Sequence, residues 1–554
     1  MSTPPQHRAI VINETAILLG FVVRQKLSDA SVRVVIRWRR LMATCVTLFA
    51  LAWLSLAAIL FYHFKYQKDF DDVSYAGMVT LPFRLDAHRE EMGNYHIKSG
   101  IAAIEEQDYR NGFRLLRMGV VRAPSNLEGR GLVAEFYEIA LTRPDLATEV
   151  MLSGLKYGGQ EDIKFLKQTL SLLLRQQMDD EVIELAETIL PKKPELTDLN
   201  RIIAFAAANA SHLRGNYDKA DDYLSGYQLL NSLDGVILSS RISWDRGNQL
   251  AAIEKLEASL RKYPNSEVLL MQLISNHLER DELDEARRYA ILRNINNPLN
   301  YSPRIELLQI YNKSGDTERE TREIERMLDL FSEDEKAMQS LANFAAETGN
   351  VGLARHVYEK TLENEFDIST CSLLLIESHL VSRDYAGALK FADELIKERP
   401  DWLDQNAAIF GSLRAISAYA MNRPDLGEIY LKEFIENNSN KPGTYLAVAR
   451  RLQAIDLSHQ ARQILLIAYE RNPENQKILT ELLKTELALG NTKNLNKLLS
   501  DFLQTRRPQI NLISAAYKSL SSDRFMFTEG RDGLLLQLSA ILRENGHKSI
   551  DFDS

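Results

Sequence analysis

The stretch SRISWDRGNQLAAIEKLEASLRKYP, residues 240–264, is one copy of a pattern that runs through residues 233–400 with a period of 34 residues. A period of this length is typical of a unit of two helices, which buries its apolar face only by stacking on neighbouring units. Three kinds of residue keep the period. Helix-ending positions are Pro264, Pro298, Ser332, Phe366 and Pro400; small or substituted positions are Ala252, Ala286, Glu320, Ala354 and Ala388; turn positions are Gly247, Asp281, Gly315, Gly349 and Arg383.

Each of these positions has a physical reason in a helical pair. The turn position separates the two helices, where a left-handed backbone costs glycine least. The small residue lies early in the second helix, where the two helices must approach closely. The proline ends the second helix, because it cannot continue the backbone hydrogen bonding. The pattern therefore predicts a stack of helical pairs.

The residues of two units resemble the tetratricopeptide repeat family. One unit has Ser240, Gly247, Ala252, Leu256 and Pro264, and another has Ile376, Asp384, Tyr385, Ala388, Ala392 and Pro400. The resemblance implies a right-handed α-solenoid. With the N-terminal transmembrane helix predicted below, we expect an all-α fold.

The predicted transmembrane helix covers residues 41–64, which include no Asp, Glu, Lys or Arg. As a helix these residues span about 36 Å, which exceeds a hydrocarbon core of about 30 Å. Their length and uniform apolarity disfavour a buried core helix, and residues 1–40 upstream disfavour a cleaved signal peptide. We therefore expect one helix in the lipid bilayer.

Basic residues predict the orientation of this helix. Arg33, Arg37, Arg39 and Arg40 precede it, whereas only Lys65 and Lys68 follow closely, beside three aspartates. We expect the N-terminus in the cytoplasm and the repeats in the periplasm, with the helix in a bacterial inner membrane.

The remaining divisions follow from the two predicted elements. Residues 1–40 form a basic cytoplasmic segment, with a short helix expected over Ala9–Val23 and a basic amphipathic lead-in over Ser31–Arg40. Residues 65–92 are a spacer. Residues 93–509 hold about eleven units, and residues 510–554 cap the array with helices over Leu512–Leu520 and Gly533–Leu542.

Charge and motifs exclude several functions. The net charge is −9 although residues 1–40 are basic, so the array is acidic and unsuited to nucleic acid. Cys45 and Cys371 are too far apart in their predicted elements to pair, and no zinc spacing exists. No phosphate loop, HExxH or GxSxG motif is present. We predict no enzyme, no cofactor, no metal and no small-molecule substrate. His212, His277 and His379 fall on separate units, where packing is the expected role.

The family resemblance also implies a binding groove. In this family the first helix of each unit lines the concave face, and matching positions give the candidate partner-binding residues. They are Asn209, His212, Arg241, Trp244, Gln309, Asn312, Gln339, Asn343, Tyr419 and Arg450. Asn209 and Asn343 match one position of a carboxylate clamp known in the family, but Leu238 and Leu374 replace the next asparagine, so we reject that clamp.

These observations favour a membrane-anchored scaffold or assembly factor for a bacterial envelope complex of the secretion, surface-polymer export or pilus type. Its partners are expected to be membrane or envelope proteins. The alternative is a cytosol-facing adaptor that recruits soluble partners to a membrane. An enzyme with a site in the irregular residues 128–200 is a third hypothesis, for which no reactive pair can be named.

Overall fold

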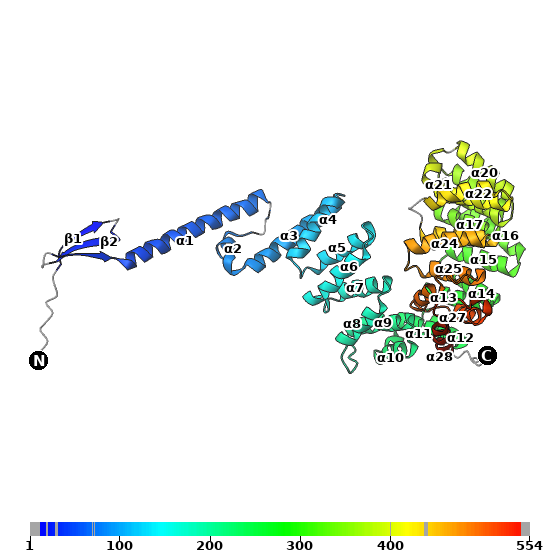
Figure 1. Cartoon of the computed structure of the whole chain (residues 1–554), viewed down its shortest axis with the longest axis horizontal. Coiled ribbons are helices and arrows are strands. Elements are labelled where there is room, and N and C mark those ends of the chain that lie inside the picture. The colour runs from blue at the N-terminus through cyan, green and yellow to red at the C-terminus, as the bar shows by residue number, and fades with distance from the viewer. Residues whose placement is uncertain are drawn as a thin grey trace. The chain divides into compact units, whose positions relative to one another are not determined.

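The computed structural model describes residues 11–17, 20–27, 31–68, 70, 73–398, 400–436 and 441–544. The chain divides into two compact units, Met1–Met178 and Asp179–Ser554. In the first unit a small sheet precedes a long helix, and helical pairs follow; the second unit consists of helices (Figure 1). The predicted helical-repeat architecture is confirmed for the described residues from 85 onward.

A three-stranded antiparallel sheet replaces the short helix expected over Ala9–Val23, so that prediction is wrong over the described part of the segment. Its strands are β1 (Val11–Ile17), β2 (Val22–Leu27) and β3 (Val32–Ile36), paired in the order β1-β2-β3. The sheet also takes half of the ten residues expected to form the amphipathic lead-in.

Side chains and pairing explain why these residues form strands. β-Branched residues occupy four of the seven positions in β1 and four of the five in β3. Gly20 adopts a φ of 82° in the turn between β1 and β2. Glu14 on β1 lies 2.6 Å from the amide nitrogen of Gln25 and 2.9 Å from the guanidinium of Arg37. Strand stability depends on such cross-strand partners, which the isolated segment does not display.

Helix α1 (Trp38–Tyr62) follows the sheet and continues through a π-helical turn, η1 (His63–Gln67). Within the described ranges, this stretch is the one helix long and apolar enough to cross a membrane, judged by length and composition. Ala57 is its single buried residue, and Phe70, Val73 and Met78 pack in the same cluster. The predicted spacer therefore contains ordered structure that folds back onto α1, namely α2 (Tyr75–Val79) and the 3₁₀ turn η2 (Leu81–Phe83).

The first unit then forms helical pairs with irregular ends. Its elements are α3 (Leu85–Glu105), α4 (Tyr109–Arg122), α5 (Leu127–Glu135), η3 (Phe136–Ala140), α6 (Pro144–Gly154), η4 (Leu155–Gly159) and α7 (Ile163–Arg175). Helices α3 and α4 cross at glycines on both sides. A Cβ atom added to Gly93 would lie 2.8 Å from the carbonyl oxygen of Gly119, and one added to Gly100 would lie 3.0 Å from that of Gly112.

The second unit continues the alternation of first and second helices. Its elements are α8 (Asp179–Ile189), α9 (Asp198–Leu213), α10 (Tyr217–Gly226), η5 (Leu229–Asn231), α11 (Leu233–Asp245), α12 (Gln249–Lys262), α13 (Glu267–Glu279), α14 (Leu283–Asn296), α15 (Ser302–Ser314), α16 (Thr317–Phe331), α17 (Glu335–Thr348), α18 (Val351–Glu363), α19 (Ile368–Val381), α20 (Tyr385–Glu398), α21 (Pro400–Ala420), α22 (Pro424–Glu436), α23 (Pro442–Ala454), α24 (Ser458–Arg471), α25 (Gln476–Leu489), α26 (Leu495–Leu503), α27 (Ile510–Ser521), η6 (Asp523–Phe525) and α28 (Arg531–Glu544).

The predicted turn position adopts the left-handed backbone in every regular unit. The φ angles there lie between 60° and 82°, at Gly247, Asp281, Gly315, Gly349 and Arg383. The same conformation recurs at the corresponding turns before and after this block, at Gln107, Thr142, Gln177, Gly215, Asn422, Asp456 and Gly490. The sequence period is therefore a period of backbone conformation, and it extends to degenerate units that lack the glycine.

Small residues and a continuous apolar seam hold the pairs together. Ala252, Ala286, Ala354 and Ala388 are at most 1% exposed, as expected for close helix crossings. One core cluster runs from Leu308 in α15 to Leu542 in α28. The two C-terminal helices pack on this cluster through one face, as a terminal cap requires.

Candidate functional site

The ten predicted groove residues differ in exposure. Arg241, Gln309, Asn312, Asn343 and Arg450 are exposed. Asn209, Trp244, Gln339 and Tyr419 are partly buried, and His212 is buried. All ten lie on first helices, namely α9, α11, α15, α17, α21 and α23.

Half of these residues share one step of the repeat. Each lies six residues before the left-handed turn position: Asn209, Arg241, Gln309, Asn343 and Arg450. Ser275 and Lys484 occupy the same step and are exposed. They are not among the ten residues predicted from the sequence. We call these seven residues the first-helix stripe. It presents a polar side chain at this step of α9, α11, α13, α15, α17, α23 and α25, whereas α19 has Glu377 there and α21 has the buried Ile416.

Polar contacts within a first helix or between neighbouring first helices orient several of these side chains. Arg241 Nε donates to Gln272 Oε1 over 3.2 Å, which links α11 to α13. Arg450 lies 3.4 Å from Glu481, which links α23 to α25. Asn343 donates to Glu347 one turn along its own helix, over 2.8 Å. These contacts are exposed, so a ligand could replace them at little cost.

Tyr419 and His212 pack within the fold. A Cβ atom added to Gly427 would lie 2.7 Å from the ring of Tyr419, so this ring fills the crossing of α21 and α22. His212 is 2% exposed, and its Nε2 lies 2.7 Å from Asp245 Oδ2. Both residues support the helices rather than offer a free polar surface.

His277 and His379 brace the turn between the helices of their pair. His277 Nδ1 lies 2.7 Å from Glu282 Oε2, and His379 Nδ1 lies 2.8 Å from Asp384 Oδ2. Each histidine stands four residues before the left-handed position, and each acid one residue after it. The expected packing role of these histidines thus includes a specific polar contact across the turn.

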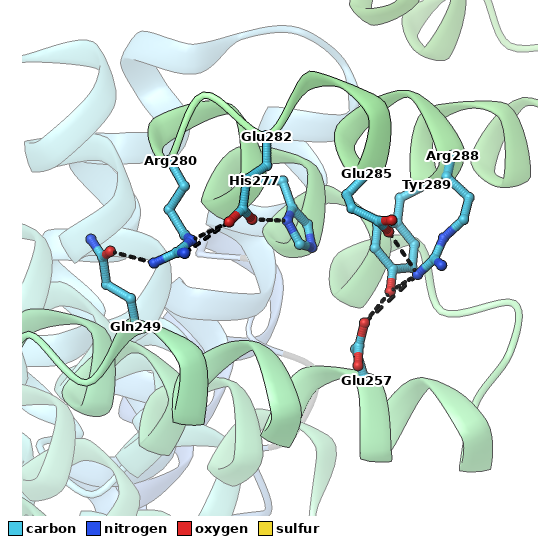
Figure 2. A network of polar contacts seen from close by, with 8 residues as sticks. All are labelled: Gln249, Glu257, His277, Arg280, Glu282, Glu285, Arg288 and Tyr289. Atoms are coloured by element: carbon cyan, nitrogen blue, oxygen red, sulfur yellow. Dashed lines mark hydrogen bonds and ion pairs between the residues drawn. The ribbon is translucent and has the colours of Figure 1, made fainter.

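Figure 2 shows this contact between α13 and α14, together with its neighbours. Arg280 donates to Glu282 over 2.8 Å and to Gln249 over 3.0 Å, so it ties the turn to α12. The hydrogen bond from Arg280, followed by that from His277, lowers the pKa of Glu282. The carboxylate therefore stays charged at lower pH than in an unfolded chain.

A second part of the same network connects α12 and α14. Tyr289 donates to Glu257 over 2.6 Å, and its ring stacks on His277 with the centroids 5.5 Å apart. Arg288 donates to the Tyr289 hydroxyl over 2.6 Å (Figure 2). Burial, together with the nearby Glu257, raises the pKa of Tyr289 to about 12. The phenol therefore remains a donor at neutral pH.

The second unit also makes contacts between residues more than 260 positions apart. Asp179, which is fully buried, lies 2.6 Å from Arg506 Nε and 3.1 Å from Arg214 Nε. Arg507 lies 2.9 Å from Asp245, the partner of His212. We call the contacts of Arg506 with Asp179 and of Arg507 with Asp245 the closing ion pairs, because they join α8 and α11 to the segment between α26 and α27.

Sequence reasoning missed the closing ion pairs for a physical reason. Asp179 looks like an ordinary acidic residue in the first turn of a helix, where charge favours it. Arg506 and Arg507 look like a loop pair. Only the curvature accumulated over the intervening helices brings them together, and no spacing in the sequence encodes it.

A shallow hollow on the second helices is a different candidate surface. It has a volume of about 800 Å³ and lies on α12 and α14. Its apolar lining includes Leu260, Ile291, Leu292 and Ile295, with Arg261 and Arg288 beside them. Within the part of the chain that the structure describes, no group of three or more His, Cys, Asp or Glu side chains is arranged to hold a metal ion.

Comparisons with known proteins give only distant likeness. No protein-family model and no curated protein sequence matches the chain. Among solved structures, a tetratricopeptide repeat protein from Parabacteroides merdae is 20% identical, with 45% of this chain and 96% of that chain covered and a TM-score of 0.28.

Two further structures cover more of the chain. Yeast Tom70 is 15% identical over 90% of this chain and 96% of its own, with a TM-score of 0.31. The structure of Naa15/Naa10 bound to HypK-THB is 14% identical over 89% and 80%, with a TM-score of 0.30. The assignment of a helical-repeat fold therefore rests on the helices and turns described above.

Proposed function

We propose that this protein is a membrane-anchored scaffold that binds protein partners along its first-helix stripe. Helix α1 anchors the chain in a lipid bilayer, and the second unit supplies the binding surface. The partners are membrane or envelope proteins, which an anchored scaffold meets at raised local concentration.

The observation that carries this proposal is the register of the stripe. The first helices α11, α15, α17 and α23 present Arg241, Gln309, Asn343 and Arg450 at one step of the repeat. Amide and guanidinium groups at regular intervals suit an extended peptide or a helix, because such ligands offer hydrogen-bonding groups at regular intervals too. The surface side chains bond mainly to near neighbours, so a ligand can recruit them.

The orientation follows from the arginines before α1. Arg39 and Arg40 lie at the start of this helix, and Arg33 and Arg37 stand just before it. Positive charge on one side favours the cytoplasm for that side. The proposed scaffold therefore faces the periplasm of a bacterial envelope and serves a secretion, polymer-export or pilus complex. A cytosol-facing adaptor is the alternative.

Site-specific photo-cross-linking tests the binding surface. A photoreactive amino acid replaces Gln309 in the stripe or Ile295 in the hollow of the second helices, where Ile295 is 67% exposed. We expect discrete protein adducts from position 309 and none from position 295 in intact cells. Adducts from position 295 alone would contradict the proposal and assign the hollow as the binding surface.

A reporter fused after Ser554 tests the orientation. Alkaline phosphatase activity is expected, because this enzyme folds only outside the cytoplasm. Fluorescence of a reporter that matures only in the cytosol would support the adaptor instead. The reporter result leaves the cross-linking result interpretable, since a binding surface works on either side.

A further inference from the structure

We propose that residues 73–85 enter the bilayer beside α1 and present Tyr75, Phe83 and Leu85 to lipid acyl chains. We call the segment 73–85 the membrane wedge. This inference rests on the proposed anchoring by α1 and extends it, because it changes the segment expected to be a spacer into part of the membrane domain.

Two hydrogen bonds place the wedge beside the middle of α1. Trp53 Nε1 donates to the carbonyl oxygen of Val79 over 2.8 Å. The hydroxyl of Tyr75 donates to the carbonyl oxygen of Leu54 over 3.1 Å. Ala57 and Met78 pack in one cluster beside these contacts and are 1% and 2% exposed. Helix α2 therefore lies against α1 before α3 begins (Figure 1).

The position of Trp53 along α1 gives the depth of the wedge. Trp53 stands twelve residues after Leu41, the first residue beyond the arginines. Twelve helical residues rise about 18 Å, whereas a hydrocarbon core is about 30 Å thick. If α1 crosses the bilayer from Leu41, Val79 then lies about 12 Å below the far boundary of the core. The wedge is thus level with the leaflet next to the helical repeats.

The composition and surface of the wedge suit this depth. Residues 73–83 read VSYAGMVTLPF and contain no charged side chain. Phe83 is 93% exposed, Leu85 60% and Tyr75 41%. Apolar area costs about 25 cal/mol per Å² in water, whereas acyl chains impose no such cost. Lipid is therefore the surrounding that these side chains fit. Their apolar surface continues the exposed apolar surface of α1.

Several backbone amides of the wedge have hydrogen-bond partners within the protein, as a segment in lipid requires. Polar backbone groups in lipid must find partners within the protein. Gly77 N donates to Ser74 Oγ over 3.1 Å, and the amides of Met78 and Thr80 donate within the same turn over 3.1 Å. The amide of Phe83 donates to Thr80 over 3.0 Å. Charge resumes at Arg84, which is paired with Glu91.

Collision measurements on spin labels test the wedge in the full-length chain. Cys45 is replaced by Ser, and Cys371 remains because it is 1% exposed. Single variants Phe83→Cys, Leu85→Cys, Leu56→Cys and Phe527→Cys carry a nitroxide in lipid nanodiscs. Leu56 on α1 is 45% exposed and marks the anchor, whereas Phe527 in the second unit is 90% exposed and marks water.

We expect the labels at positions 83 and 85 to gain collisions with oxygen and lose collisions with a nickel chelate, as the label at position 56 does. A water-like label at positions 83 and 85, beside a lipid-like label at position 56, would overturn the wedge and leave the anchor intact. A water-like label at position 56 would overturn the anchor, and with it this inference.

Discussion

The α3–α4 pair of the first unit and the α13–α14 pair of the second unit follow one two-helix plan but are held differently. Glycines bring the backbones of α3 and α4 together, with Gly93 facing Gly119 and Gly100 facing Gly112. Side chains hold α13 and α14, through buried Leu273 and Ala286 and the polar network around Glu282.

The difference concerns what each pair tolerates. A glycine crossing leaves no space, so any added atom must displace a backbone. A side-chain interface adjusts by changing rotamers. When one polar group is removed, the remaining hydrogen bonds of its network still hold the two helices together. The first pair is therefore expected to depend on shape, and the second on charge and hydrogen bonding.

The largest expected loss of stability comes from removing the charge of Asp179 in the second unit. The Asp179→Asn variant leaves Arg214 and Arg506 facing a neutral group, and breaking such a buried pair costs about 3 kcal/mol. Hydrogen exchange in detergent should then show faster exchange in residues 504–509. Asp180→Asn is the matched control, because its side chain is 79% exposed and lies 3.6 Å from Arg214. Equal effects of both variants would contradict a structural role for the closing ion pairs.

A methyl group at the glycine crossing should have the next largest effect. In Gly93→Ala the new Cβ would lie 2.5 Å from the backbone nitrogen of Ala123, so α3 and α4 must separate. We expect a loss of about 1–3 kcal/mol in the free energy of unfolding, measured by urea titration.

Gly352→Ala in α18 provides the control for this experiment, because its nearest neighbour is an Asn350 oxygen 3.6 Å away. That variant should be neutral or stabilising by up to about 1 kcal/mol, since alanine favours helix. If Gly93→Ala behaves in the same way, the two pairs do not differ as described.

The left-handed turns, which both units share, should give a smaller effect of opposite sign at two positions. Gly247→Ala places a side chain at a φ of 82° and should cost about 1 kcal/mol. Arg383→Gly removes a side chain at a φ of 62° and should gain up to about 1 kcal/mol. Thermal unfolding of the two variants measures the difference; identical shifts would refute the conformational reading of the period.

The smallest expected effect is a change in the pH dependence of stability at the α13–α14 turn. Arg280 and His277 lower the pKa of Glu282, so the unfolded chain takes up this proton at higher pH. The resulting stabilisation is present above the ordinary glutamate pKa of about 4.3 and is lost as pH falls through the lower folded value. Glu282→Gln should flatten the acid limb of the unfolding curve, whereas Glu254→Gln on the exposed side of α12 should not.

The sequence predicts the local features of this fold well and the long-range features poorly. The turn register at Gly247 and Arg383 and the buried Ala286 follow from periodicity, because each is fixed within one unit. The two C-terminal helices were expected where the period ends, because a terminal unit needs a different outer face. The sheet at residues 11–36 was missed, since its stability comes from pairing between segments. For the same reason the fold of residues 73–85 onto α1 was not foreseen.

The candidate site shows the same division. The step of the repeat placed Arg241, Gln309 and Asn343 on exposed first-helix surface, because helical geometry determines which face a residue occupies. It did not separate them from His212, which is buried and lies in hydrogen-bond contact with Asp245 of the next unit. Exposure within a repeat array is thus set partly by neighbours, which a pattern within one unit does not contain.

The contact between Asp179 and Arg506 limits how this chain can change in length. Tandem arrays commonly gain or lose whole modules by duplication and deletion of gene segments. Here a module added between these two residues would carry the arginine past its acidic partner by one helical pair. Insertions and deletions of whole modules are therefore expected before residue 179 or after residue 507, and the interval between them should keep its module number in related chains.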